Sequence, residues 1–337
     1  MRATLSRRLL AALLLSCGCG DAAPPAGPTC AELDDAVLLP HVQGLGSHNS
    51  YHLEPALPLD DSHRYSHPTL TAQAEQGVRA FELDVHLSDA GDLEVFHLPA
   101  IDDETTCPTL AGCLAELRAW SDAHPCHTPL MIWIEPKDDA DDLFPGYQPL
   151  TGHIAQIDAA VAAAWPRLFT PDQLRGDHAT LPDALGDWPP LSALRGHALF
   201  ALLDSSEHRA EHLDGAPALE GRAMFADADG PDEPWAAMLK IDDAPGDGRV
   251  PDLAAQGFVI TSNAAGADPS NDVLEADWQA TLAAGPHYLS TDHLWPTGGA
   301  TWIATLPGGS PRCLPGIAPA ACVDADLERS EQDPPLE

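Results

Sequence analysis

Four short segments of the chain carry side chains that could together bind a cation and move protons. They are residues 46–51, 81–86, 95–97 and 132–137, and each resembles the end of a buried strand. The candidate site residues within them are two histidines, one asparagine and three carboxylates: His48, Asn49, Glu82, Asp84, His97 and Glu135.

Carboxylate and amide oxygens are the ligands of a hard cation. Calcium takes about six to eight oxygens in a loose geometry, so the asparagine and the three carboxylates could hold it together with water and a substrate oxygen. Magnesium usually takes fewer protein ligands, and zinc would need more histidine or cysteine. A cation beside a phosphodiester acts as a Lewis acid, and His48 and His97 could supply the proton transfers. The sequence therefore predicts a calcium-assisted site that cleaves phosphodiesters.

Strand alternation would bring these groups to one face. In a strand over residues 81–86, Glu82, Asp84 and His86 point to one side, and Glu135 shares a face with Lys137 in the same way. Lys137 could contact a substrate phosphate, or it could be a surface lysine whose stem covers apolar atoms.

Each motif alone is weak, because a single Glu-x-Asp pair or histidine after an apolar run usually has no catalytic role. The four segments together, in order at strand ends, favour a site. The chain has 16 histidines, and we treat most of the others as background. These are His41, His52, His63, His67, His86, His124, His127 and His153.

The elements that would position the site alternate along the chain. Strand-like runs, separated mostly by helical patterns such as residues 110–120 behind the N-cap Thr109, predict an α/β fold: an irregular TIM-like (β/α)8 barrel forming a single domain over residues 30–324. Only seven residues separate Val85 from Leu93, too few for a helical crossover, so we expect a loop there. The runs lie near residues 42–45, 78–85, 93–96, 130–134, 198–203, 236–241, 258–261 and 288–290.

The N-terminal residues have the pattern of a targeting segment. Arginines precede a short apolar run, so residues 1–19 are expected to be a signal peptide with a lipobox, followed by a flexible tether over residues 20–29. Spacing favours Cys17 as the acylated cysteine, whereas acylation of Cys19 leaves an even number of cysteines. An ordinary secretory signal cut near Ala22 or Ala23 is the alternative. We expect an exported protein, either a cell-envelope lipoprotein or secreted.

Export predicts disulfides rather than metal-binding cysteines. Sequence proximity suggests that Cys107 pairs with Cys113 and Cys313 with Cys322, which leaves Cys30 for Cys126, although six cysteines allow about fifteen pairings. The acidic, proline-bearing residues 325–337 are expected to form a disordered tail.

The formal net charge is −36. A nucleic-acid partner is therefore not expected, because phosphate backbones need a basic surface. An anionic membrane surface would also repel the protein on average. We expect a monomer.

The four segments resemble the catalytic X region of phosphatidylinositol-specific phospholipases C, especially the calcium-dependent secreted bacterial type, over residues 41–296. The resemblance implies that His48 stabilises the transition state, that His97 is the general acid, and that Glu82 or Glu135 helps deprotonate the inositol 2-hydroxyl. It implies calcium ligands at Asn49, Glu82, Asp84 and Glu135. The products would be diacylglycerol and an inositol phosphate, formed through a cyclic phosphodiester. The family pattern includes an arginine near residues 261–263, which this chain lacks.

Two alternatives remain open at this point. Glycerophosphodiester phosphodiesterases share the barrel, the Glu-x-Asp strand and the following histidine, but they usually carry His-Arg-Gly where this chain has His48 followed by Asn49. The other alternative is a non-catalytic envelope lipoprotein that binds phosphorylated polyols.

Overall fold

The computed structural model describes residues 29–138, 144–204, 207–266 and 270–333. Eight parallel strands form its centre, in the order β7-β6-β4-β2-β1-β10-β9-β8, and the single bridge Asp227↔Met238 joins the two outer strands. This nearly closed ring is the predicted TIM-like barrel. The strands are β1 (Val42–Ser47), β2 (Val78–Ser88), β4 (Leu130–Pro136), β6 (Ala198–Leu202), β7 (Phe225–Ala226), β8 (Met238–Lys240), β9 (Val259–Asn263) and β10 (Tyr288–Thr291).

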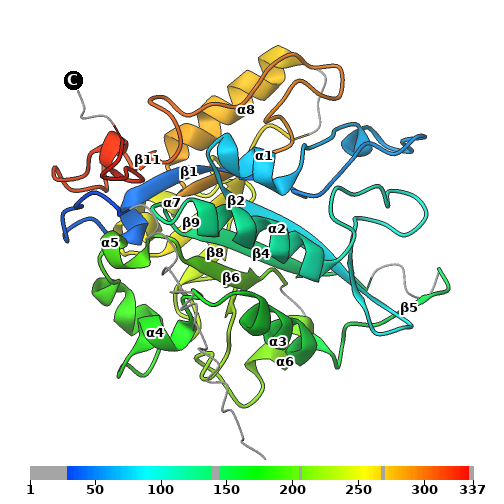
Figure 1. Ribbon diagram of the computed structural model, residues 1–337, viewed down its shortest axis with the longest axis horizontal. Helices are drawn as coiled ribbons and strands as arrows, with labels where there is room; N and C mark the ends of the chain where they lie inside the picture. Colours follow the sequence, from blue (N-terminus) through cyan, green and yellow to red (C-terminus); the bar gives the residue numbers. More distant parts are fainter. Residues whose placement is uncertain (1–28, 139–143, 205–206, 267–269, 334–337) are drawn as a thin grey trace, which may run out of the picture.

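Helices surround the strands, with α1 and α8 on one side and α3, α4 and α6 on the opposite side (Figure 1). The predicted helix behind Thr109 is confirmed, since the Thr109 hydroxyl accepts a hydrogen bond from the amide of Gly112 at 3.1 Å. The helices are α1 (Leu70–Glu75), α2 (Leu110–Ala123), α3 (Ile154–Ala164), α4 (Pro171–Arg175), α5 (Leu191–Leu194), α6 (Glu207–Leu213), α7 (Val250–Ala255) and α8 (Asn271–Ala284).

The short connection after Val85 is a hairpin. Strand β2 runs on to Ser88, and β3 (Leu93–Val95) returns antiparallel to it, with Val85 opposite Val95. The expectation that residues 93–96 form a barrel strand is therefore wrong, because so short a connection permits only an antiparallel return. The one barrel strand that the sequence did not predict is β7. Its two residues are too few to show an alternating apolar pattern. The small strand β5 (Tyr147–Gln148) also pairs with the extension of β2.

Large side chains fill the barrel. Trp133 on β4 donates its indole N–H to the hydroxyl of Thr261 on β9 at 3.1 Å, which spans the interior. All eleven residues of β2 are buried, including Glu82 and Asp84. The carboxylates therefore project into a packed interior.

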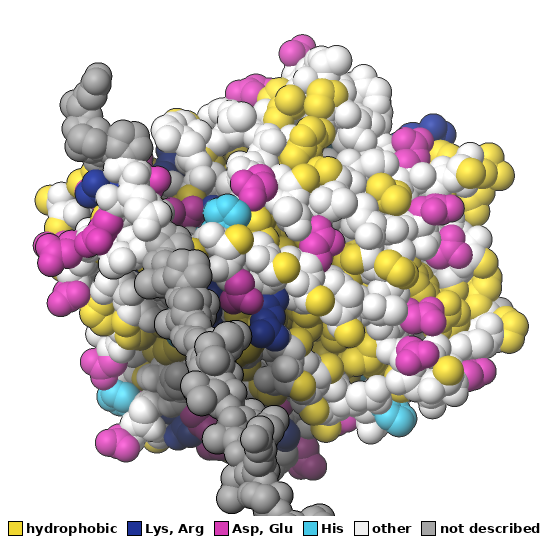
Figure 2. Space-filling view, in the orientation of Figure 1, with side chains coloured by type: hydrophobic (Ala, Val, Ile, Leu, Met, Phe, Trp, Pro, Cys, Tyr) yellow, Lys and Arg dark blue, Asp and Glu magenta, His cyan; other side chains and the backbone are white. Residues whose placement is uncertain are grey.

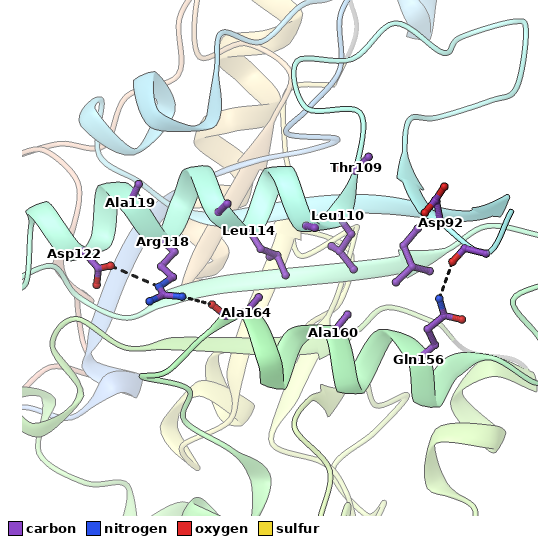
Figure 3. A pocket seen from close by; sticks show the side chains of 14 residues that line it. Asp92, Thr109, Leu110, Leu114, Arg118, Ala119, Asp122, Gln156, Ala160 and Ala164 are labelled. Carbon is purple, nitrogen blue, oxygen red and sulfur yellow. Dashed lines mark hydrogen bonds and ion pairs between the residues drawn. The ribbon is translucent and has the colours of Figure 1, made fainter.

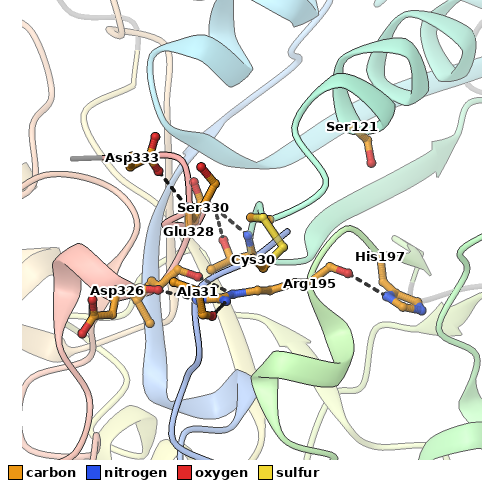
Figure 4. Close-up of a disulfide and its surroundings, with 12 residues drawn as sticks. Cys30, Ala31, Ser121, Arg195, His197, Asp326, Glu328, Ser330 and Asp333 are labelled. Carbon is orange, nitrogen blue, oxygen red and sulfur yellow. Dashed lines mark hydrogen bonds between the residues drawn. A yellow bond between two sulfur atoms is a disulfide. The ribbon is translucent and has the colours of Figure 1, made fainter. Parts of the chain in front are cut away.

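Both ends of the described chain pack against one side of the barrel (Figure 4). The Arg195 guanidinium donates to the carbonyls of Ala31 at 2.6 Å and Leu327 at 2.8 Å. Leu327 is fully buried, and Glu328 forms an ion pair with Arg79 at 2.5 Å. The expectation of a disordered tail from residue 325 is therefore wrong for residues 325–333; residues 334–337 lie outside the described part.

The three predicted disulfides, Cys30–Cys126, Cys107–Cys113 and Cys313–Cys322, are confirmed. Disulfides are typical of exported proteins. The signal segment and all of the tether except Thr29 lie outside the described residues. Within the part of the chain that the structure describes, no helix is long and apolar enough to cross a bilayer.

A groove of about 670 Å³ lies between α2 and α3 on the outer face of the barrel (Figure 3). Its floor is formed by small and apolar side chains such as Leu114, Ala160 and Ala164, with Arg118 near one end. None of the candidate site residues lines it, so it is separate from the predicted chemistry.

Candidate functional site

Three carboxylates gather beside the end of β4, two from the middle of β2 and one from β4 itself. Glu82 and Asp84 project from the same face of β2, and the strand register places Glu135 of β4 beside Asp84. Each of the three offers an oxygen, and these oxygens lie within 4.8 Å of one another. Glu82 and Asp84 are buried, while the side chain of Glu135 is 29% exposed. The predicted alternation is thus confirmed.

The only two lysines in the chain meet these carboxylates. The Lys137 ammonium lies 2.5 Å from Glu135 Oε1 and 3.3 Å from Asp84 Oδ2. Lys240, at the end of β8, donates to Glu82 Oε2 at 2.7 Å. Burial and the charge of Asp84 raise the pKa of Glu135 to about 7. The cluster therefore pairs three carboxyl groups with two ammonium groups.

The donor set fits a calcium ion. Neither carboxylate oxygen of Asp84 has a hydrogen-bond partner among the described residues, although the Lys137 ammonium is near one of them. A buried acceptor without a donor is costly unless something else satisfies it, and a cation would do so. The groups are hard oxygen donors, which calcium prefers to the nitrogen and sulfur ligands of zinc. Asn49, buried and in the left-handed region at φ 41°, follows the β1 strand and offers an amide oxygen.

His48 follows β1 and faces the carboxylates. Its Nε2 lies 4.0 Å from Glu82 Oε1, and its Nδ1 lies 2.8 Å from Asp292 Oδ1. Burial lowers the pKa of His48, but the charges of Asp292 and Glu82 outweigh it and raise the pKa to about 9. The side chain is 33% exposed, so a protonated imidazole is presented to a substrate at neutral pH.

His97 is held by a different carboxylate. Its Nδ1 lies 2.7 Å from Asp102 Oδ2, and His52 Nε2 lies 2.8 Å from the other oxygen of Asp102. Burial raises the pKa of Asp102, but its bonds to the two histidines hold that pKa well below its usual range. The Nε2 of His86 lies 3.2 Å from the carbonyl oxygen of Phe96, and the two rings stack. His97 therefore lies on a loop fixed from both sides, not at the end of a barrel strand.

Aromatic contacts run from His48 toward His97 through Tyr65 and His52. The ring of Tyr65 stacks on His52 at 4.1 Å between centroids and lies 6.3 Å from the ring of His48. The structure thus brings Glu82, Asp84, Glu135 and Lys137 together, with His48 4.0 Å from Glu82. His97 belongs to a second group with Asp102 and His52.

Several residues of the site were not predicted. Asp102 and Asp292 orient the histidines, and Lys240 pairs with Glu82. His52 and His86, which we treated as background, position His97. The scarcity of lysine was the available signal for Lys240, because the chain has only two lysines. The two aspartates lie on loops and carry no local sequence pattern that marks them.

A lysine lies beside the segment where an arginine was expected, residues 261–263. Lys240 on β8 lies directly opposite Thr261 on β9 in the parallel register. Its side chain is 6% exposed and points to Glu82, so this side of the site keeps a cation despite the missing arginine.

Comparison with known proteins agrees with this geometry. The structure is similar to a Ca2+-dependent phosphatidylinositol-specific phospholipase C from Streptomyces antibioticus, with 22% identity, 76% of this chain and 95% of that chain covered, and a TM-score of 0.56. It is also similar to a calcium-dependent phosphoinositol-specific phospholipase C from Pseudomonas sp, with 17% identity, 84% and 98% covered, and a TM-score of 0.57. No curated protein matches the chain.

The family model described as "Phosphoinositide phospholipase C, Ca2+-dependent" matches residues 37–93 and 87–313. That match covers most of the folded part and includes every segment of the site. The protein belongs to the Ca2+-dependent phosphoinositide phospholipase C family, a family of phosphoric diester hydrolases.

Proposed function

We propose that the protein cleaves phosphatidylinositol to diacylglycerol and an inositol phosphate, through a cyclic phosphodiester. The observation that carries the proposal is a cluster of three carboxylates, two of them buried, together with His48 and His97, each held by its own aspartate. Family membership supports the same substrate class.

Calcium held by Asn49, Glu82, Asp84 and Glu135 would supply Lewis-acid neutralisation of the phosphoryl oxygens. A protonated His48 donates to a non-bridging oxygen as charge develops there. Its ion pair with Asp292 keeps the ring in place.

The inositol 2-hydroxyl must lose a proton as it attacks phosphorus. Glu82 and Glu135 are the candidate bases, and each is paired with a lysine; we favour Glu135, because it is partly exposed while Glu82 is buried. Lys137, which lies beside Glu135, would contact the phosphate of the bound substrate.

The leaving diacylglycerol oxygen must gain a proton. His97 is the proposed donor, because Asp102 engages its Nδ1 and leaves Nε2 for the substrate. Its side chain is 26% exposed, so a lipid oxygen could approach it.

Access to a membrane poses an electrostatic problem. Acidic side chains are scattered among apolar ones over the face in Figure 2 and outnumber basic ones there. On the loop that follows β1, however, Leu57 and Leu59 are 74% and 67% exposed. We propose that these leucines enter the lipid surface, since apolar insertion does not depend on surface charge.

This membrane contact is testable with one double variant. The L57S/L59S chain should lose roughly tenfold in activity on vesicles, while activity on a soluble short-chain substrate stays unchanged. Equal losses on both substrates would contradict the proposal.

The anchor remains part of the proposal. We propose export followed by acylation at Cys17 or Cys19, and a monomeric folded domain. Labelling cells with a fatty-acid analogue should mark the wild-type chain and fail in one of the two single Cys→Ala variants. Labelling in neither wild type nor variants would indicate an ordinary secretory signal.

The function itself is tested by substrate choice. The chain lacking residues 1–28 is incubated with phosphatidylinositol or with glycerophosphoinositol, in calcium or in chelator. Calcium-dependent release of diacylglycerol that is lost in H48A and H97A, but not in the exposed control H153A, is the expected result. Release of glycerol phosphate from glycerophosphoinositol would instead favour a glycerophosphodiesterase.

A further inference from the structure

A second group of metal-ligating side chains lies beside the proposed general acid. His63, His97 and Asp102 each offer one ligand atom, and these atoms lie within 4.8 Å of one another. His63 comes from the short helix Asp61–His63 on the loop after β1, and the other two come from the loop after β3. The backbone joins the two loops, because the amide of Leu53 donates to the carbonyl of Glu104 at 3.2 Å.

His63 has no evident structural role at this position. It is 7% exposed, and its Nδ1 is buried without a hydrogen-bond partner among the described residues. Its Nε2 lies 4.0 Å from Asp102 Oδ2, beyond hydrogen-bond distance, and its ring meets the ring of His97 edge-on at 5.7 Å. Neither ring nitrogen of His63 thus makes a hydrogen bond with the described residues, and a metal on Nε2, the nitrogen that faces Asp102, would engage one of them.

The donor set differs in kind from the calcium cluster. Two imidazoles and one carboxylate, with water as a fourth ligand, match zinc and related transition metals, whereas the calcium cluster offers only oxygen. We propose that His63, His97 and Asp102 form an inhibitory site for a zinc-like divalent ion. Binding rests on this geometry alone, and the inhibition rests on the proposed role of His97.

Small movements would complete the site. Ligand atoms about 2.0–2.2 Å from a tetrahedral zinc lie roughly 3.3 Å apart. The 2.7 Å contact between His97 and Asp102 would need to open slightly, and the 4.0 Å separation between His63 and Asp102 would need to close slightly. His52 holds the other oxygen of Asp102 at 2.8 Å and would keep the carboxylate oriented.

Occupancy of the site would disable His97 as an acid. The proton between His97 Nδ1 and Asp102 would be released to solvent as the metal takes that nitrogen. The Nε2 proton of a metal-bound neutral imidazole leaves only by forming an imidazolate, so it is a far weaker acid than an imidazolium. The leaving lipid oxygen would then lack its proton donor.

Cobalt reports binding without any need for turnover. The full chain, saturated with calcium, is titrated with Co2+ and its visible absorption is followed. We expect a tetrahedral cobalt band that H63Q weakens at least tenfold in apparent affinity and that H153Q preserves. H63C should retain a band with added thiolate charge transfer, which distinguishes a lost ligand from a misfolded loop. A band equally strong in wild type and H63Q overturns the site.

Zinc tests the inhibition. With calcium saturating, zinc should inhibit the wild type, and H63Q should need at least tenfold more zinc at an unchanged basal rate. Equal zinc sensitivity of wild type and H63Q overturns the inhibitory role. If the wild type has no phospholipase activity, the proposed function fails while the cobalt result still decides whether the metal site exists.

Discussion

At the scale of single residues, each proposed catalytic histidine depends on an aspartate that contacts it. Asp102 holds both His97 and His52, and it is buried. Replacing Asp102 with asparagine keeps the side-chain shape but puts a neutral amide in place of the carboxylate that contacts the imidazole. We expect D102N to lower kcat by about 100-fold or more with little change in KM, while D103N, at the exposed neighbouring position, keeps full activity. Unchanged kcat in D102N would show that His97 does not need this partner.

Lys137 competes with a cation for two carboxylates. Because its ammonium lies against Glu135 and Asp84, we expect K137M to tighten calcium binding by about tenfold, since a nearby positive charge is removed. Turnover should nevertheless fall if the lysine also contacts substrate phosphate. Calorimetric titration with calcium checks the first effect, with R118M, in the outer groove, as the control. Weaker calcium binding in K137M would contradict this account.

At the scale of elements, α6 is joined to the ends of two strands through one histidine. His208 contacts Asp204 after β6 and Asp138 after β4, at 2.5 and 2.8 Å. Burial lowers the pKa of His208, but the two carboxylates outweigh it and raise the pKa to about 9. Because the pKa of His208 is higher in the folded than in the unfolded chain, its protonated form stabilises the fold. This stabilisation is complete below about pH 6.5 and is lost as the pH rises toward 9.

The corresponding test compares melting temperatures at pH 6.5 and pH 9. H208Q should melt below the wild type at pH 6.5, by roughly 2–6 °C, and the difference should shrink at pH 9. The pKa of His48 is also raised, but His48 is present in both the wild type and H208Q. The difference between their melting temperatures therefore reports on His208 alone. H153Q should follow the wild type, and a pH-independent difference would contradict the linkage.

The sequence predicted most of the elements because their patterns are local. Seven of the eight barrel strands and helix α2 with its cap follow from apolar runs and from Thr109. The two-residue strand β7 has no period to detect. Asp102, Asp292 and Lys240 reach the site through loop geometry and strand register, which depend on the whole barrel rather than on neighbouring residues.

At the scale of the whole molecule, covalent links join distant parts of the chain. Cys30–Cys126 closes a span of 96 residues, and Cys313–Cys322 closes a span of 9. Because a longer loop loses more entropy on closure, removing the first should cost about 4–5 kcal/mol and removing the second about 2–3 kcal/mol. Urea unfolding of C30S/C126S and C313S/C322S measures both, and the reverse order would contradict the entropic account.

The central claim is that calcium in the carboxylate cluster enables the two histidines to cleave phosphatidylinositol. Phosphorus NMR of phosphatidylinositol in mixed micelles tests it directly, because the cyclic inositol phosphate has its own resonance. We expect that resonance to grow with calcium, to be absent with chelator and to be lost in D84N, while D92N, exposed near the turn of the same hairpin, behaves as wild type. A cyclic product that forms equally with chelator, or equally in D84N, would contradict the account.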